Sequence, residues 1–331
     1  MTVFSLPANQ PGTFYRGAGR IAAFRSGQAL PDRPEDWVAS ATSRFALAPA
    51  GLTTLPDGRV LAEAIAADPA WWLGPGAGSE PGVLVKLLDA GQRLPLHVHP
   101  DRRFATSHLA SPYGKTEAWV IVSAEPGAVV HLGFARDVEA GELAGWVQRQ
   151  KVGEMLAATN RVEVRAGDAV LCPAGVPHAI GAGILLVEVQ EPTDFSVLLE
   201  YDGFALDGPA DGHLGLGYDL ALRCVDRSGW GADRLAALRG GADRLLPAAA
   251  DPFFTAERVR PAAVLPAGFA VLVVIAGAGT LAGEHDRLAV RRGDTLLIPY
   301  AAGPLTLTGD VEAVRLGPAV AQSMRHDGVR A

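Results

Sequence analysis

Short runs of hydrophobic residues, broken by glycine and proline, recur along most of the chain, and runs of this length are typical of β-strands. Residues 83–90 form one such run and predict a buried strand. Residues 118–124 and 128–135 predict two further strands. In residues 184–190 the side chains alternate, so Glu188 shares a face with Leu186 and Gln190. The pattern favours a mainly β fold.

Two segments carry the 3.6-residue spacing of helices instead. Residues 60–74 predict a helix that ends before Pro69, with Trp71 and Trp72 packed behind it. Residues 136–160 place Leu143, Trp146 and Val147 on one apolar side, which predicts a helical insertion between strands. Near the start of the chain, residues 1–30 predict irregular structure, and residues 35–47 predict one or two strands.

The last third of the chain returns to the β pattern. Residues 204–252 are interrupted by glycine and proline, with one plausible helix at 219–225, and predict a linking region wrapped on the first part of the chain. Short strands with Gly/Pro turns then recur through residues 253–331. Such a series is typical of an all-β barrel.

Composition, net charge and hydropathy argue against several classes of function. The net charge of −7 argues against a nucleic-acid partner, because phosphate binding requires a basic face. No apolar run is long enough to cross a bilayer, and the first residues lack a secretory pattern, so we expect a cytoplasmic protein without a membrane partner. The two cysteines, Cys172 and Cys224, give neither a disulfide framework nor a zinc-finger spacing.

Two separate stretches carry residues that bind metals. In an extended segment His97 and His99 point the same way, with Val98 opposite, and the Pro-Asp that follows ends the strand. Glu117 begins a later strand, and His178 follows a Pro-Ala-Gly turn. Three imidazoles and one carboxylate suit a first-row divalent metal. If both stretches line one barrel, His97, His99, Glu117 and His178 form a metal site inside it.

These stretches resemble the two motifs of the cupin family. The first motif is a glycine, five residues and His-x-His; the second is a glycine, five residues, Pro-x-Gly, two residues and a histidine. The matching residues are Gly91, His97 and His99, then Gly167, Pro173, Gly175 and His178. The long segment between His99 and Glu117, and Lys115 two positions before Glu117, are similar to the type I mannose-6-phosphate isomerases.

The resemblance implies two cupin-type (jelly-roll) β-barrels. Residues 1–203 would form the metal-binding barrel with the helical insertion near 136–160, and residues 204–252 the linking region. Residues 253–331 repeat the outline of the second motif with Gly293, Pro299 and Gly303 but without its histidine, which predicts a degenerate barrel without a metal.

The resemblance also implies the chemistry. Lys115 matches a lysine at the family's active site, and Glu188 would point into the barrel beside the metal. Aldose–ketose isomerisation through an enediol needs such acid/base groups to move a proton between neighbouring carbons. Zn is the leading metal, and Fe, Mn, Ni or Co suit the same ligands.

The chain departs from the family at two positions. His97 stands where the family usually has Gln. Leu198 stands four residues after Asp194, where the family has an Arg. Because an Arg commonly binds phosphate, Leu198 favours an uncharged sugar or polyol, although Arg102, Arg103 and Arg223 could reach the mouth of the site from another side.

The sequence therefore predicts a metal-dependent isomerase that acts on a carbohydrate, either a sugar or a sugar phosphate. Two alternatives remain open: a cupin with other metal chemistry, such as an oxygenase, and a non-catalytic sugar-binding relative. The sequence does not specify the sugar or the oligomeric state.

Overall fold

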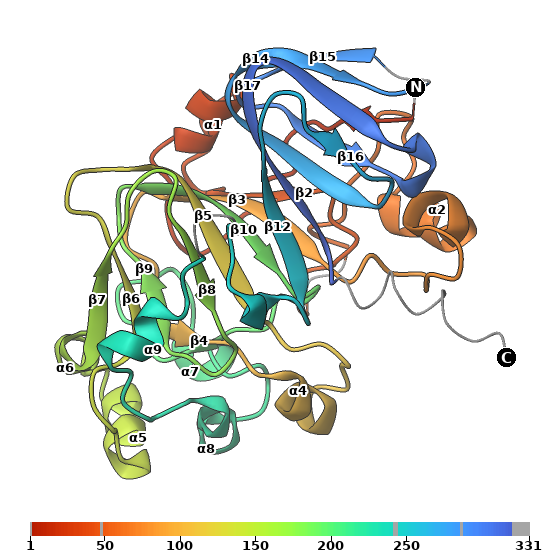
Figure 1. The fold of residues 1–331 in the computed structure, drawn as a ribbon. Coiled ribbons are helices and arrows are strands. Elements are labelled where there is room, and N and C mark those ends of the chain that lie inside the picture. The colour runs from red at the N-terminus through yellow and green to blue at the C-terminus, as the bar shows by residue number, and fades with distance from the viewer. Residues whose placement is uncertain (1, 47–48, 241–243, 285–286, 320–331) are drawn as a thin grey trace, which may run out of the picture.

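Three β-sheets dominate the structure, as Figure 1 shows. The computed structural model describes residues 2–46, 49–240, 244–284 and 287–319. The mainly β class expected from the hydrophobic pattern is confirmed, and the named strands pair with one another in antiparallel fashion. Within the described part of the chain, the helices are too short or too polar to cross a lipid bilayer.

Each sheet has its own strand order. The first sheet is β2 (Glu35–Val38), β3 (Leu84–Ala90), β10 (Ile184–Gln190), β5 (Glu117–Ala124) and β8 (Ala169–Cys172). The second is β11 (Val197–Leu198), β4 (His97–Val98), β9 (His178–Ile180), β6 (Val129–Phe134) and β7 (Thr159–Glu163). The third is β1 (Phe4–Ser5), β16 (Thr295–Ile298), β14 (Ala270–Ala282), β17 (Leu305–Pro318) and β12 (Phe254–Val259), with β13 (Val264–Leu265) on β17 and β15 (Arg287–Arg291) on β14.

The first sheet is covered on both faces. Val85 and Val187 belong to one buried hydrophobic cluster with Phe254 and Val273 of the third sheet. On the opposite face, Glu188 lines a cavity that second-sheet residues line as well. A strand buried on both sides needs apolar residues at nearly every position. This explains why β3 and β10 appear in the sequence as almost continuous hydrophobic runs.

Helices cover the outer face of the second sheet. Leu143 and Val147 of α5 (Ala140–Gln148) and Met155 of α6 (Val152–Ala158) lie in one buried cluster with Val98 and Phe134. These two helices occupy the segment where helical spacing was predicted, and β7 begins directly after α6 at Thr159. Val98 therefore packs outward against helices while its neighbours His97 and His99 face the other way.

The remaining helices are short. They are α1 (Arg20–Arg25), α2 (Leu61–Ala67), α3 (Pro69–Leu73), α4 (Arg102–His108), α7 (Gly208–Asp211), α8 (Tyr218–Ala221) and α9 (Ala232–Ala236), with 3₁₀ turns η1 (Leu222–Cys224), η2 (Ala248–Ala250) and η3 (Tyr300–Ala302). The predicted end of a helix before Pro69 is confirmed, and the chain starts α3 at that proline, so Trp71 and Trp72 are helical.

Several short helices were missed in the sequence, among them α1, α4, α7 and α9. The expectation of irregular structure over residues 1–30 is wrong at β1 and at α1, and α1 begins after Gly19 without a side-chain cap of its own. Asp89, distant in sequence, instead accepts hydrogen bonds from the backbone N–H groups of Ala18 and Arg20. At α4, the Asp101 side chain accepts from Phe104 N, so the residue that ends the strand also caps a helix.

The strand pattern predicted over residues 35–47 is too long, because β2 ends at Val38. Leu47 lies outside the described residues.

The buried Asp89 carboxylate provides a test of this packing. It also pairs with the Arg20 guanidinium, Nη1 to Oδ1 at 3.1 Å. Because Asp89→Ala leaves the N–H groups of Ala18 and Arg20 and the Arg20 guanidinium without their buried acceptor, we expect a loss of about 2 kcal/mol of unfolding free energy. Asp89→Asn keeps one acceptor oxygen and should lose less. Denaturant unfolding measures both, with the exposed Asp202→Ala as the control; equal losses in all three variants would contradict the capping role.

Candidate metal centre

Two neighbouring strands and the facing sheet bring the four predicted ligands together. In the register of β4 and β9, His97 lies directly opposite His178. The ring centroids of these two residues are 4.1 Å apart, and His99 lies 4.9 Å from His97 and 4.8 Å from His178. Glu117 arrives from β5 in the first sheet, with Oε2 3.0 Å from His99 Nε2 and Oε1 3.3 Å from His178 Nε2. All four side chains are buried.

Backbone carbonyls orient the three imidazoles in the same way. His97 Nδ1 lies 2.8 Å from Pro95 O, His99 Nδ1 2.7 Å from Phe195 O, and His178 Nδ1 2.8 Å from Val176 O. A carbonyl only accepts, so each Nδ1 carries the proton and each Nε2 keeps a free lone pair. Histidines that bind a metal usually donate the other ring N–H in this way.

The carboxylate is held just as firmly. Trp119, two residues further along β5, donates its indole Nε1–H to Glu117 Oε1 at 2.9 Å. On the other side, Lys115 Nζ lies 3.3 Å from Glu117 Oε2 and 3.0 Å from His99 Nε2. The four groups are therefore fixed in orientation before any ligand binds.

The protonation of these groups favours metal binding. Burial and the Lys115 ammonium lower the pKa of His99 to about 3, and burial together with the other two imidazoles holds the pKa of His97 well below its usual value. Burial alone would raise the pKa of Glu117, but Lys115 and His99 keep it well below its usual range. Neutral imidazoles and an ionised carboxylate are the forms that bind metals.

Two orphaned atoms show that the cluster fits a divalent cation. Among the described residues, Glu117 Oε2 and His178 Nε2 are buried yet make no hydrogen bond. A carboxylate and a neutral imidazole with Nδ1 protonated present only lone pairs to each other, so they cannot satisfy one another. His97, His99 and His178 place ligand atoms close enough to hold one ion, and Glu117 and His178 form a second such group with Cys172.

Cys172 is a weaker candidate than the other members of these groups. Its side chain is buried at the end of β8, where burial and the Glu117 charge raise the pKa of the thiol well above its usual value. A protonated thiol is a poor ligand. Cys172 therefore packs as a small buried hydrophobic residue.

A cavity of 840 Å³ opens from the cluster. Its walls come from both sheets, because Lys86 and Glu188 of the first sheet and His97 and Leu198 of the second all line it. Lys115, one of the two predicted catalytic residues, lines it as well. The space between the first and second sheets is thus continuous with the candidate ligands.

A buried ion-pair network on the cavity wall was not predicted. Lys86 Nζ lies 3.5 Å from Glu35, 3.7 Å from Glu188 and 3.6 Å from Asp194. The ammonium also sits 4.5 Å from the centre of the Trp37 ring. A signal did exist in the sequence, because Lys86 and Glu188 each interrupt a hydrophobic run, and the two are cross-strand neighbours.

Within this network, Glu188 has a raised pKa. Burial and the nearby Glu117 charge raise the pKa of Glu188 to about 7, although Lys86 opposes the shift. Its Oε1 is buried and accepts no hydrogen bond from the described residues. A carboxyl group that titrates near neutral pH can both accept and return a proton.

The arginines expected near the mouth lie elsewhere. Arg102 pairs with Glu191, Nε to Oε1 at 2.5 Å, while Arg103 and Arg223 line a separate cavity of 450 Å³. The guanidinium that lines the cavity beside the histidines is that of Arg44. Arg44 lies in the loop after β2, where the sequence predicted a strand and not part of a cavity wall.

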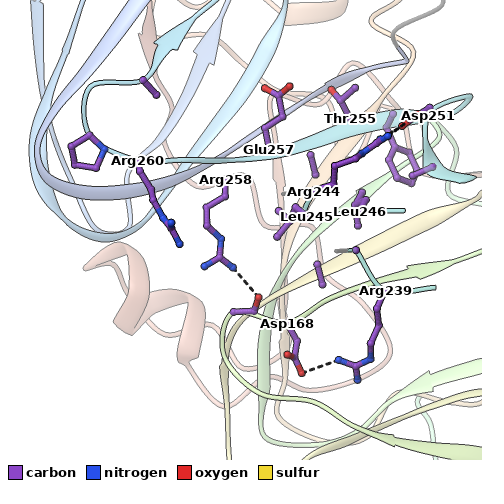
Figure 2. Close-up of a pocket in the computed structure, with 18 of the residues that line it drawn as sticks. Asp168, Arg239, Arg244, Leu245, Leu246, Asp251, Thr255, Glu257, Arg258 and Arg260 are labelled. Carbon is purple, nitrogen blue, oxygen red and sulfur yellow. Dashed lines mark hydrogen bonds and ion pairs between the residues drawn. The ribbon is translucent and has the colours of Figure 1, made fainter. Parts of the chain in front are cut away.

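A larger cavity of 1040 Å³ lies between the first and third sheets, and Figure 2 shows Arg239, Arg244 and Arg258 of its lining directed at acceptors. Arg239 Nη1 is 3.3 Å from Asp168, Arg258 donates to Gly167 O at 2.9 Å, and Arg244 pairs with Asp251. The described residues that line it include no histidine or cysteine. It therefore belongs to the packing between sheets rather than to the candidate metal centre.

Comparison with known proteins supports the resemblance drawn from the motifs. Residues 258–318 match the family model for the mannose-6-phosphate isomerase cupin domain. The chain is 28% identical over 237 residues to the mannose-6-phosphate isomerase of Streptococcus mutans, covering 70% of this chain and 72% of the relative. It is 37% identical over 121 residues to the mannose-6-phosphate isomerase ManA of Bacillus subtilis, covering 36% and 37% respectively.

Solved structures extend the comparison over the whole fold. The crystal structure of the mannose 6-phosphate isomerase from Bacillus subtilis superposes with a TM-score of 0.76 at 20% identity, covering 96% of this chain and 99% of the other. A mannose 6-phosphate isomerase bound with zinc and yttrium gives a TM-score of 0.74 at 16% identity, covering 97% and 100%. The predicted resemblance is confirmed, and the chain shares the fold of these structures.

The raised pKa of Glu188 predicts how the stability of the metal-free protein depends on pH. The folded state binds the Glu188 proton more tightly than the unfolded state, so its contribution is complete below the ordinary carboxyl pKa of 4.5 and is lost as pH rises through about 7. Glu188→Gln mimics the protonated acid. Its unfolding free energy relative to wild type should therefore increase between pH 4.5 and 7, by up to about 1.4 kcal/mol per pH unit.

Denaturant unfolding at a series of pH values measures this difference, and the exposed Glu63→Gln controls for the loss of one carboxylate. A difference that does not change with pH would show that the folded protein does not perturb Glu188.

Proposed function

We propose that the chain is a metal-dependent aldose–ketose isomerase of the mannose-6-phosphate isomerase type. The observation that carries the proposal is the convergence of three imidazoles on the Glu117 carboxylate, beside a cavity that His97, Lys115, Glu117 and Glu188 line. The relatives named mannose-6-phosphate isomerase, at 28% and 37% identity, support the reaction class.

His97, His99, Glu117 and His178 would hold one divalent ion, with zinc as the leading candidate. The ligand set suits zinc, and a structure with the same fold was solved with zinc bound. The bound ion would polarise the sugar oxygens next to the reacting carbons. Neutral histidines with fixed Nδ1 protons allow the site to bind the ion near neutral pH without first losing protons.

Lys115 and Glu188 would handle the protons. Isomerisation removes a proton from the carbon next to the carbonyl and returns one to the former carbonyl carbon, through an enediol. Glu188 has a pKa near 7 and an oxygen free to accept, which suits the base. The Lys115 ammonium, within 3.3 Å of Glu117, lies beside the candidate ligands and is placed to donate toward an oxygen of the substrate.

The architecture supports the same assignment. In this proposal the first and second sheets form the metal-binding cupin barrel within residues 1–203, α5 and α6 are its helical insertion, and residues 204–252 link it to a second barrel over residues 253–331. Both potential metal-binding groups found among the described residues lie between the first two sheets. His285, in the second part, lies outside the described residues.

Metal content tests the ligand set directly. His99→Ala and His178→Ala each remove a nitrogen that would bind the ion, so we expect metal per chain, measured by elemental analysis after dialysis, to fall well below wild type. His108→Ala, an exposed histidine of α4, is the matched control. Full occupancy in both site variants would refute the proposed metal site.

Kinetics test the proton-handling residues. Glu188→Gln and Lys115→Met should retain fold and metal but lose about 10²–10⁴-fold in kcat, the usual effect of removing a general acid or base. The exposed Lys151→Met provides a control for loss of a lysine. The assay follows aldose–ketose conversion of free and phosphorylated hexoses, and oxygen uptake in the same samples would reveal an oxygenase instead. Near-wild-type turnover in Glu188→Gln would exclude it as the base.

A further inference from the structure

We infer that the substrate of this cavity is an uncharged monosaccharide rather than a sugar phosphate. The inference rests on the proposed isomerase function and specifies its substrate class. It comes from the charges on the cavity wall, since a phosphate ester carries about two negative charges near neutral pH and requires cations in fixed geometry.

The cationic side chains on the described cavity wall are already paired. They are Arg44, Lys86 and Lys115. Lys86 has three carboxylates within 3.7 Å, and Arg44 Nε lies 3.6 Å from Asp194 while its Nη1 donates to Gly12 O. Lys115 is engaged with Glu117 and His99 at the candidate metal centre. A phosphate bound to any of them would compete with a carboxylate that already lies beside it.

The carboxylates on the wall outnumber these cations. Those within the network or at the metal centre are Glu35, Glu117, Glu188 and Asp194. Two further carboxylates, Asp32 and Asp211, are exposed on the wall and form no ion pair with the described residues. They would repel a phosphate dianion but accept hydrogen bonds from sugar hydroxyls.

The wall next to the histidines is apolar on one side. Leu198 is buried on β11 directly opposite His97 in the register, so an uncharged side chain occupies the position beside the proposed reacting centre. Leu206 and Leu214 line the same cavity. Such a surface accommodates the C–H groups of a sugar and offers no donor to a phosphate.

Ligand binding tests the inference without depending on turnover. Zinc-loaded protein is titrated by calorimetry with mannose, glucose and fructose and with the 6-phosphate of each, and isomerisation of the same compounds is followed in parallel. We expect the free sugar to bind at least tenfold more tightly than its phosphate in one or more pairs. Tighter binding of the phosphates, or no binding of either member of any pair, would overturn the inference.

Variants test whether the charges on the cavity wall cause the preference for free sugars. Leu198→Arg introduces a guanidinium beside the histidines and should shift the preference toward the phosphate by about tenfold or more, the effect of one charge-assisted hydrogen bond. Leu198→Met is the neutral control of similar size. If the buried arginine prevents folding, the exposed Asp32→Asn/Asp211→Asn pair replaces it, and should improve phosphate binding several-fold at low salt. An unchanged preference in a folded Leu198→Arg or in the paired variant would contradict the electrostatic argument.

The two hypotheses fail differently. A protein that binds free sugars but converts none of them would retain this inference and lose the isomerase assignment. A protein that isomerises sugar phosphates in preference to free sugars would retain the isomerase and lose this inference.

Discussion

The residues between the first and second sheets are arranged around one constraint. Charged side chains are buried there, and each needs partners that compensate its charge. A buried ion is costly unless partners surround it. Here Lys86 lies among three carboxylates, and Glu35 is bound in turn by Tyr15 OH at 2.5 Å and Trp37 Nε1 at 2.7 Å. This arrangement lowers the pKa of Glu35 to about 2 despite its burial. At Glu188, burial and the Glu117 charge outweigh the nearby lysines and raise the pKa to about 7, so its proton is exchangeable near neutral pH.

The candidate metal centre obeys the same rule through different partners. His97 and His99 stay neutral because burial disfavours their cations, and all three imidazoles direct Nδ1 at a backbone carbonyl. The Glu117 carboxylate stays ionised because Lys115 and His99 lie beside it. Backbone hydrogen bonds therefore orient the imidazoles, while burial and Lys115 keep the groups in forms that bind metals, before substrate or metal arrives.

The sequence anticipated the features that local patterns encode. Alternation and hydrophobic runs located β3, β5 and β10, helical spacing located α5 and α6, and two short motifs located the histidines. What it missed depends on long-range contacts. The start of α1 is capped by Asp89 from β3, and the environment of Lys86 comes from residues spread between β2 and the segment after β10.

The arginines near the cavity also show that local sequence patterns do not encode long-range contacts. Proximity in sequence to His99 made Arg102 and Arg103 attractive, but α4 carries both away from the cavity. Arg44 reaches it from the loop after β2, where the sequence pattern predicted a strand.

The pairing of β1 with β16 has a consequence for how the protein is made. Phe4 lies opposite Leu297, so the first strand of the chain completes a sheet whose other members are all encoded near its end. During synthesis, the ribosome releases β1 long before its partner exists. The strands of the first and second sheets can pair as they emerge, whereas β1 must remain unpaired until residues 295–298 have been made. Contacts of such sequence separation form slowly, so we expect β1 to join the third sheet late in folding.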